Sequence, residues 1–292
     1  MKIFLIDHNQ VLGDIKKEFE VVNKIEDSDA VILWNDVLPL ERAIINLAHS
    51  LGKKTFVIQH GRWGTSRYYP PFNEKIQANK LLVWGEFDRR ALIEAGQNSK
   101  KIEVVGTTVF SHLKPRVKHK GTNVIFFPEH WDRPVAENLQ VRDELRKLKG
   151  VNILTKLIDS PSHEQKLYDN VVYSDRGNNN HLDICADILS TADLVVGISE
   201  STFGLLAAYL NIPVVIMEEW EPKAFGGDTR YAEGYRRIIS PAAKKATLKI
   251  LCDTIKQQLK NPDELKEERK RVCVDEGGLG LDTVSLIKEV IG

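Results

Sequence analysis

The chain is poor in cysteine and carries no net charge. Its three cysteines lie far apart without the spacing of zinc ligands, which argues against disulfides or structural zinc and favours a reducing compartment. Lysine plus arginine and aspartate plus glutamate both number 41, so the formal net charge is zero and no overall field recruits nucleic acid. We therefore expect no nucleic-acid partner, and any basic site must be local.

Long apolar runs are also missing. No uninterrupted apolar segment approaches the roughly 20 residues that a membrane-spanning helix needs. The first residues, Met1–Ile6, form a strand-like run instead of a signal peptide. We expect a cytoplasmic protein, with peripheral contact at the inner face of the cell membrane left open.

Several short motifs of well-known enzyme classes are absent. The chain has no G-x-x-x-x-G-K-[ST] phosphate loop, no G-x-G-x-x-G after its first apolar run and no H-E-x-x-H pair. Kinases, dehydrogenases and zinc hydrolases therefore lose their usual support. We expect neither a bound metal nor a cofactor.

Short apolar runs do alternate with helical patterns, and at 292 residues the chain has room for two cores. The strand candidates of the first half are Lys2–Ile6, Ala30–Trp34, Thr55–Ile58, Leu81–Trp84 and Ile102–Val105. The helix candidates between them are Leu40–Leu51, which stops at Gly52, and Arg89–Ala95, which stops at Gly96.

A polar, basic stretch, Ser111–Thr122, precedes a second series of the same kind and is the expected linker. The second series comprises the strand candidates Val124–Phe127, Val151–Leu154, Val171–Tyr173, Leu194–Ile198 and Pro213–Met217 and the helix candidates Val135–Leu148 and Leu182–Leu189. The tail from Thr247 is expected to be helical. The predicted domains are residues 1–112, residues 122–280, and a C-terminal helix at 281–292 that packs back on the first domain.

Strands that alternate with helices pair in parallel through right-handed crossovers. The predicted fold is α/β, with two Rossmann-like domains facing across a cleft. In open parallel sheets, ligands bind beyond the carboxyl ends of the strands. The turns that follow strands are therefore where we look for chemistry.

The turn in Leu194–Met217 is the most informative one. Ser199, Ser201 and Thr202 stand between an apolar strand and a compact apolar helix, where free N–H groups and the helix dipole favour an anion. Plain capping of the helix by Ser201 or Thr202 fits the same pattern. Glu200 suits a ribose hydroxyl, or the helix dipole alone.

A second turn, after the strand that ends at Ile58, holds His60 and Gly61. The unperturbed pKa of histidine, about 6.5, allows it to take a proton from a hydroxyl near neutral pH. A structural histidine in a turn is the alternative. Arg62 and Arg67 follow among aromatic residues, in a loop that suits a sugar or an anionic acceptor or packs on the surface. His8, after the first strand, is expected at the same edge.

Two further cations follow strands of the second series. Arg133 follows Val124–Phe127 and suits a phosphate, although a surface ion pair with Asp132 fits nearly as well. Lys156 follows Val151–Leu154 and is expected at a strand end, as a candidate phosphate ligand.

Three passages resemble the GT-B group of nucleotide-sugar glycosyltransferases. The first is VIQHG with LLVWGEFDRRALIEAG and KIEVVGTTVF, similar to bacterial surface-polysaccharide enzymes such as CDP-glycerol glycerophosphotransferases and Kdo-type transferases. The second is FFPEHWDRP, and the third is ADLVVGISESTFGLLAAYLNIPVVI. The resemblance implies that His60, with Gly61, is the catalytic base and that Ser201 and Thr202 bind the donor phosphates.

The chain departs from its relatives at two places. Relatives often show Lys-x-His-Pro where this chain has Lys156-Leu157-Ile158-Asp159, which puts Lys156 in doubt. UDP-GlcNAc 2-epimerases share the architecture but carry paired glutamates where Leu205 and Leu206 stand here. This weakens an epimerase and leaves uridine recognition unsupported.

The leading hypothesis is a metal-independent transferase that moves a sugar or polyol-phosphate group from a nucleotide-activated donor to a cell-surface glycan or lipid-linked acceptor. A UDP-GlcNAc 2-epimerase-like enzyme is one alternative. A catalytically inactive nucleotide-sugar-binding protein is the other. The donor base, the acceptor, the stereochemistry and the oligomeric state stay open.

Overall fold

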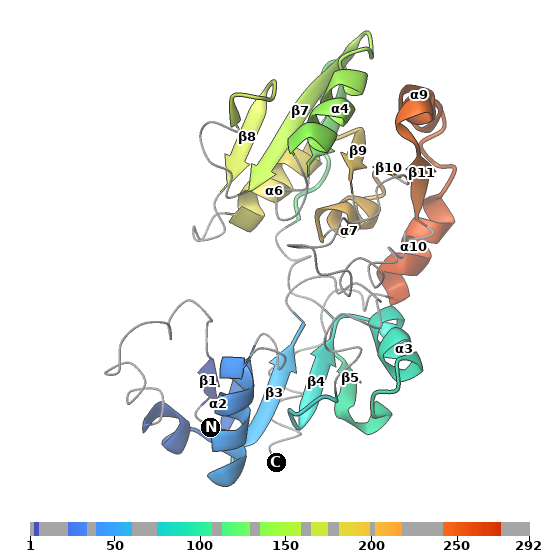
Figure 1. The fold of residues 1–292 in the computed structure, drawn as a ribbon. Coiled ribbons are helices and arrows are strands. Elements are labelled where there is room, and N and C mark those ends of the chain that lie inside the picture. Colours follow the sequence, from blue (N-terminus) through green and yellow to red (C-terminus); the bar gives the residue numbers. More distant parts are fainter. Residues whose placement is uncertain are drawn as a thin grey trace. The chain divides into compact units, whose positions relative to one another are not determined.

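The computed structural model describes residues 3–5, 23–33, 39–59, 75–106, 113–128, 135–158, 165–174, 181–198, 202–217 and 242–275 (Figure 1). The chain divides into two compact units. Unit 1 comprises Met1–Thr107 with Asp275–Gly292, and unit 2 comprises Thr108–Val274. The predicted helix at 281–292 lies outside the described residues. Each unit is built around its own sheet.

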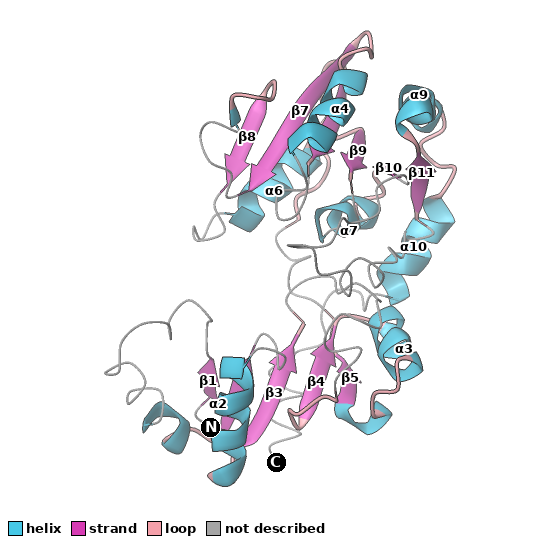
Figure 2. Ribbon diagram, viewed as in Figure 1, coloured by secondary structure: helices cyan, strands magenta, loops and turns pink. Residues whose placement is uncertain are grey.

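Unit 1 contains a five-stranded parallel sheet whose strands follow one another in chain order (Figure 2). Its strands are β1 (Ile3–Leu5), β2 (Ala30–Leu33), β3 (Lys54–Ile58), β4 (Lys80–Val83) and β5 (Ile102–Val104). Its described helical elements are residues 23–26, α2 (Pro39–Ser50), α3 (Glu86–Glu94) and the 3-10 turn η2 (Ser99–Lys101).

The helices of unit 1 stop at the predicted glycines. Gly52 has φ +69° and Gly96 has φ +90°, which are left-handed conformations that glycine adopts without strain. After α2, Lys53 N–H donates to Ala48 O at 2.8 Å, and after α3, Gln97 N–H donates to Leu92 O at 3.0 Å. These bonds close Schellman motifs, so both helix ends are confirmed.

The core of unit 1 lies on both faces of the sheet. On one face the α2 residues Ile44 and Ile45 pack with a cluster of strand side chains, Val31, Leu33, Val57, Leu81 and Val83. The alternate strand residues Ala30, Ile32, Phe56 and Leu82 form a second cluster. A strand buried on both faces reads as an unbroken apolar run, which is why these strands are visible in the sequence.

Unit 2 contains a six-stranded parallel sheet in the order β11-β10-β9-β6-β7-β8. Its strands are β6 (Thr122–Phe127), β7 (Val151–Ile158), β8 (Val171–Ser174), β9 (Leu194–Gly197), β10 (Val214–Met217) and β11 (Ala243–Ala246). Its helices are α4 (Val135–Leu145), α6 (His181–Ser190), α7 (Thr202–Tyr209), the 3-10 turn η5 (Leu248–Ile250), α9 (Leu251–Lys260) and α10 (Lys266–Asp275).

Helices cover both faces of this second sheet. On one face α4 and α9 enclose a cluster that includes Val141, Leu145, Leu251 and Ile255 from the helices and Val124, Phe126, Val196, Val215 and Met217 from the strands. Helices α6 and α7 contact each other, and α7 packs on β9 and β10. The two-faced burial again explains the continuous apolar runs of the strands.

Residues 113–120, which belong to the predicted linker, are bound to unit 2. Lys114 Nζ pairs with Asp187 Oδ1 at 2.5 Å, and Arg116 Nη2 donates to Ala192 O at 2.8 Å and to Asp193 Oδ1 at 3.1 Å. The Val117 N–H donates to Ser190 O at 2.8 Å. The basic charge of the segment therefore faces acidic side chains of α6 and of the turn before β9.

Two features of unit 2 differ from expectation. Strand β7 continues to Ile158, four residues beyond the predicted end, because its second half pairs with β8, whereas its pairing with β6 ends at Thr155. Strand β11, with the sequence AKKA, has no apolar run that would have indicated it. It lies at the edge of the sheet, where lysines are common; Lys244 Nζ pairs with Glu264 Oε1, and Lys245 is exposed.

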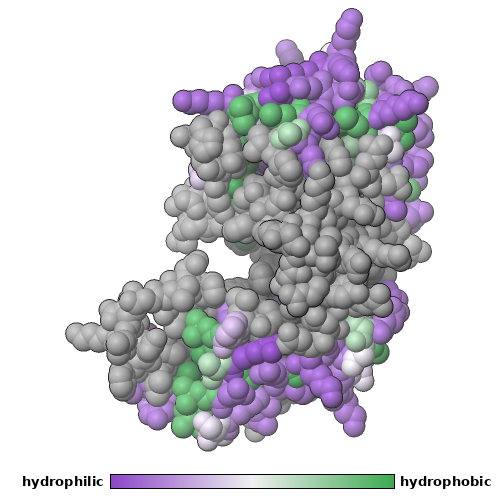
Figure 3. All heavy atoms as spheres, viewed as in Figure 1, coloured by the Kyte–Doolittle hydropathy of each residue, from purple (hydrophilic) through white to green (hydrophobic). Residues whose placement is uncertain are grey.

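The described surface is predominantly hydrophilic around α4 and α9 (Figure 3). Among the described residues the exposed large apolar side chains are Val117 in the segment before β6, Tyr173 in β8 and Ile250 in η5. Single exposed apolar residues are ordinary. No helix in the described part of the chain has the length and apolar character that crossing a bilayer requires.

Candidate functional site

The strand order of unit 2 reverses between β6 and β9. From β6 the chain adds β7 and β8 on one side, and then β9, β10 and β11 on the other. Such a reversal is a topological switch point, where ligands bind beyond the carboxyl ends of the strands. The described strands of unit 1 run in chain order without a reversal. This topology selects the carboxyl ends of β6 and β9 in unit 2, called the β6–β9 edge below, as the candidate site.

The register places the ends of the two central strands level with each other. Phe127, the last residue of β6, pairs with Gly197, the last residue of β9. The connection after β6 contains Arg133, and the connection after β9 contains Ser199, Glu200 and Ser201. The two predicted phosphate-binding segments therefore start from adjacent points on one sheet edge.

Helix α7 begins at Thr202, as predicted, and is anchored to both strands. Phe203 in its first turn is 4% exposed and stacks on Phe127, with ring centroids 5.0 Å apart and an interplanar angle of 10°. At the other end, Asn211 has φ +57°, and Ile212 N–H donates to Ala207 O at 2.9 Å. Both ends of this helix are thus fixed, which holds the N–H groups of its first turn in one orientation.

Most of the predicted site residues lie outside the described residues. They are His8, His60, Gly61, Arg62, Arg67, Arg133, Ser199, Glu200 and Ser201. For Thr202 the backbone is described as the first residue of α7, and its side chain is not. The roles assigned to these residues stay predictions.

Lys156 is described in full, and it does not lie at a strand end. It pairs with Val172 of β8 inside β7, two residues before the strand stops, and its side chain is completely buried. Its Nζ donates to Leu157 O at 2.7 Å and to Ser174 Oγ. The sequence placed it wrongly because the predicted strand was too short.

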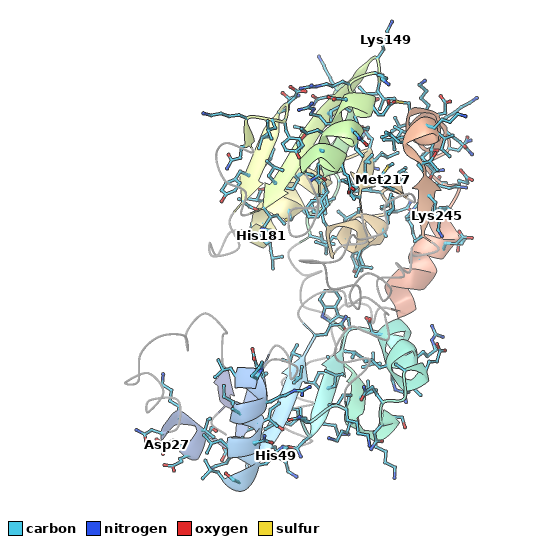
Figure 4. The ribbon with its side chains drawn as sticks, in the orientation of Figure 1. Asp27, His49, Lys149, His181, Met217 and Lys245 are labelled. Atoms are coloured by element: carbon cyan, nitrogen blue, oxygen red, sulfur yellow. The ribbon has the colours of Figure 1, made fainter. Side chains whose placement is uncertain are left out.

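The contacts of Lys156 continue into α6. Ser174 Oγ lies 2.7 Å from His181 Nδ1, and His181 Nε2 lies 3.9 Å from Cys185 Sγ. Burial raises the pKa of the Cys185 thiol, and the nearby charge of Lys156 opposes this rise. Figure 4 labels His181 at the start of α6, at the end of the sheet toward which β7 and β8 run.

In unit 1 the residue before His60 belongs to a buried polar cluster. The side chain of Gln59 donates to Asp88 Oδ2 at 3.0 Å and accepts from Trp84 N–H at 2.8 Å. The Trp84 indole donates to Gln59 O at 2.7 Å. All three residues are at most 2% exposed. Because a peptide unit is planar, fixing this carbonyl fixes the plane of the peptide bond that leads out of Gln59.

The Gln59 cluster was missed by sequence reasoning. Gln59 directly follows a strand, which is the one local signal it offers, whereas its partners stand 25 and 29 positions away. In the described part of the chain no group of three or more His, Cys, Asp or Glu side chains is arranged to hold a metal ion.

Solved structures match this fold along most of its length. HepE from Anabaena, in complex with UDP and glucose, has a TM-score of 0.55 at 11% identity, over 94% of this chain and 80% of that chain. The chain has a GT-B-type fold. The glycotransferase of kitacinnamycin has a TM-score of 0.58 at 13% identity, over 96% of this chain and 84% of that chain.

An epimerase shares the same fold. UDP-GlcNAc 2-epimerase from Neisseria meningitidis, bound to UDP-GlcNAc, has a TM-score of 0.56 at 13% identity, over 96% of this chain and 82% of that chain. No protein-family model and no curated protein sequence matches the chain. The expected pair of Rossmann-like domains with parallel sheets is confirmed.

Proposed function

We propose that the protein is a nucleotide-sugar-dependent transferase of the GT-B group, which moves a sugar or polyol-phosphate group to a cell-surface glycan or lipid-linked acceptor. The observation that carries the proposal is the register of Phe127 with Gly197 at the switch point of unit 2. It supports a donor-phosphate site made by the segments that follow β6 and β9. Neighbours of the same fold bind UDP and UDP-GlcNAc.

In this proposal the donor diphosphate binds at the start of α7. Ser199, Ser201 and Thr202 supply hydroxyl and backbone donors, Arg133 supplies a cation, and Glu200 contacts the ribose. These groups offset the negative charge that develops on the leaving phosphate, which is electrostatic stabilisation without an obligatory metal. The apolar, capped α7 supports the proposal, because a helix held at both ends keeps its N–H groups oriented without the donor.

The acceptor side of the proposal rests on His60 as the general base. It takes the proton from the acceptor hydroxyl while Gly61 allows close approach to the backbone. Arg62, Arg67 and His8 bind the acceptor. The buried Gln59 cluster supports this role, since it fixes the backbone that leads into the turn.

The first experiment is a thermal-shift panel with CMP, CDP, UDP, GDP and their sugar conjugates. A ligand at one hundred times its Kd stabilises the protein by about 2.7 kcal/mol. His60→Ala is then expected to abolish donor turnover with a glycan acceptor and to keep the nucleotide affinity of the wild type. Loss of nucleotide binding in folded His60→Ala protein contradicts the base assignment.

A UDP-GlcNAc 2-epimerase is the second candidate, because an enzyme of that name shares the fold. Leu205 and Leu206 oppose it: both lie in α7 and are 4% and 3% exposed, so neither position offers a carboxylate. Incubation with UDP-GlcNAc decides between the two. Formation of UDP-ManNAc without any acceptor establishes the epimerase, and its absence, with donor consumed only when acceptor is present, establishes the transferase.

An inactive nucleotide-sugar-binding protein predicts a third pattern. It binds the nucleotide and consumes no donor with any acceptor.

A further inference from the structure

The buried ammonium of Lys156 is the start of a chain of side chains that joins β7, β8 and α6. Its Nζ donates to Ser174 Oγ, which contacts His181 Nδ1, and the other ring nitrogen faces Cys185 Sγ. Lys156 and Ser174 are 0% and 2% exposed, and Cys185 is 3% exposed. These contacts therefore begin in the interior at Lys156 and Ser174 and reach the half-buried ring of His181 at the start of α6.

The donors along this series of side chains favour one tautomer of His181. An ammonium group only donates, so the Ser174 oxygen accepts from Lys156. Ser174 keeps one hydroxyl proton while its oxygen accepts from Lys156, and His181 Nδ1 lies 2.7 Å away to accept that proton. In this arrangement the ring proton lies on Nε2, directed toward the sulfur of Cys185.

This series of hydrogen-bonded side chains lies beside the candidate donor site. Thr155 of β7 pairs with Phe126 of β6, so Lys156 is level with Phe127 at the switch point. Ser174 is the last residue of β8, and His181 is the first residue of α6. The contacts of Lys156 thus connect the two neighbouring strand ends and the start of the helix that follows them.

Burying an ammonium group is expensive, and an apolar side chain of similar length would fill the same space at lower cost. The Lys156 ammonium group donates hydrogen bonds to a backbone carbonyl and to a serine hydroxyl, both within unit 2. A group that holds its neighbours in place explains this arrangement better than a ligand of the donor phosphates does.

We propose that Lys156 is a positioning residue, which acts through Ser174 and His181 to hold the ends of β7 and β8 and the start of α6 beside the donor site. This inference rests on the proposed function and changes the role that the sequence predicts for Lys156. Loss of a direct phosphate ligand weakens binding of the diphosphate alone, whereas loss of a positioning residue weakens binding of the diphosphate and of its nucleoside.

The test compares ligands with and without phosphate. Affinities for UDP and uridine, and for CDP and cytidine in parallel, are measured for wild type, Lys156→Met, Ser174→Ala and the double variant. We expect each single variant to weaken the diphosphate and its nucleoside by the same factor, about tenfold, the equivalent of one hydrogen bond. The double variant is expected to be no weaker than the single ones.

Lys101→Met is the matched control. Lys101 Nζ also donates to a backbone carbonyl, Ile76 O at 2.7 Å, but it lies in unit 1. We expect this variant to keep wild-type nucleotide and nucleoside affinity.

A second readout does not depend on nucleotide binding. In ¹⁵N NMR spectra of the histidines, assigned by loss of a signal in His181→Ala, we expect wild-type His181 to show the Nε2–H tautomer. Lys156→Met and Ser174→Ala are expected to lose this tautomer preference, whereas Lys101→Met keeps it. Ser174→Ala retains the ammonium and serves even where Lys156→Met does not fold.

The outcomes separate the two proposals. Three results overturn the positioning role. They are weaker binding of the diphosphates alone in Lys156→Met, additive losses of affinity in the double variant, and a His181 signal that is unchanged in the variants. Wild-type protein that binds none of CMP, CDP, UDP, GDP and their sugar conjugates overturns the proposed function. In that case the NMR spectra still decide whether the chain from Lys156 to His181 orients the ring.

Discussion

The stacked pair Phe127 and Phe203 gives the sharpest prediction about the donor site. It joins the end of β6 to the first turn of α7, with a centroid distance of 5.0 Å. Such pairs contribute about 0.5 to 1.5 kcal/mol beyond their burial. Phe203→Leu removes the stack and leaves a small gap in a site that is 4% exposed. We expect unfolding in denaturant to show a loss of about 1 to 2.5 kcal/mol.

Phe203→Leu should also lower the affinity for the nucleotide. A helix that has lost its anchor no longer holds its first N–H groups in one place, so we expect Phe203→Leu to weaken UDP or CDP binding as well. Phe126→Leu is the control: it alters a fully buried ring one residue earlier on β6, in the cluster that faces α4 and α9. It should lower stability and leave nucleotide affinity unchanged.

A double-mutant cycle isolates the stack from general burial. Phe127→Leu, Phe203→Leu and the double variant should give a coupling of about 0.5 to 1.5 kcal/mol in unfolding free energy. A coupling below about 0.3 kcal/mol, within the usual error of additivity, refutes the role of the stack. Equal loss of nucleotide affinity in Phe126→Leu and Phe203→Leu refutes the anchoring argument.

Three further predictions concern stability. Trp84→Phe keeps the ring but leaves the buried carbonyl of Gln59 without its indole donor, so denaturant unfolding should show a loss of about 1 to 3 kcal/mol, and an unchanged midpoint contradicts this. Arg146 pairs with Asp169 through two bonds, and its hydrogen bonding lowers the pKa of that exposed carboxyl below 3.8. A lowered carboxyl pKa stabilises the fold above pH 3.8, and this stabilisation disappears as the pH falls through the pKa of Asp169 in the folded protein. The small difference in Tm between wild type and Arg146→Gln should therefore be present at pH 6 and vanish at strongly acidic pH; a difference that grows on acidification contradicts the assignment. Gly204→Ala places a Cβ 3.8 Å from its nearest described side-chain neighbour, an ordinary contact, and should raise stability by about 0.5 to 1 kcal/mol, whereas a fall in Tm shows that α7 needs this glycine.

Much of the fold could be predicted because buried parallel strands are apolar on both faces. The runs at Ala30–Trp34 and Leu194–Ile198 match β2 and β9 to within one residue. Positive φ values at Gly52 and Gly96 explain why these glycines mark helix ends so clearly. Local chemistry decides these features, so local sequence shows them.

Features decided by distant partners could not be predicted in the same way. The second half of β7 is polar at Thr155 and Lys156, and it is a strand because β8 pairs with it from Thr155 to Ile158. β11 has two lysines among four residues and forms because β10 offers a free edge. Neither element carries an apolar run that indicates its true extent.

The candidate site shows the same division. Composition predicts a phosphate-binding role for the connections after β6 and β9, and that role stays a prediction, whereas their adjacency follows only from the strand order. The partner of Lys156 on β8 stands 18 positions away, and Gln59 finds Asp88 at a separation of 29 positions. Polar pairs this far apart have no periodic signal, because a single partner anywhere in the chain satisfies them.

The central claim is that unit 2 binds the donor nucleotide at the β6–β9 edge. Hydrogen-exchange mass spectrometry with and without saturating UDP, and with CDP in parallel, tests this claim most directly. We predict slower exchange in peptides that cover 124–136 and 196–206, and unchanged exchange in peptides of β2 and α2. Protection confined to unit 1, or no protection in either segment despite saturation measured by calorimetry, contradicts the claim.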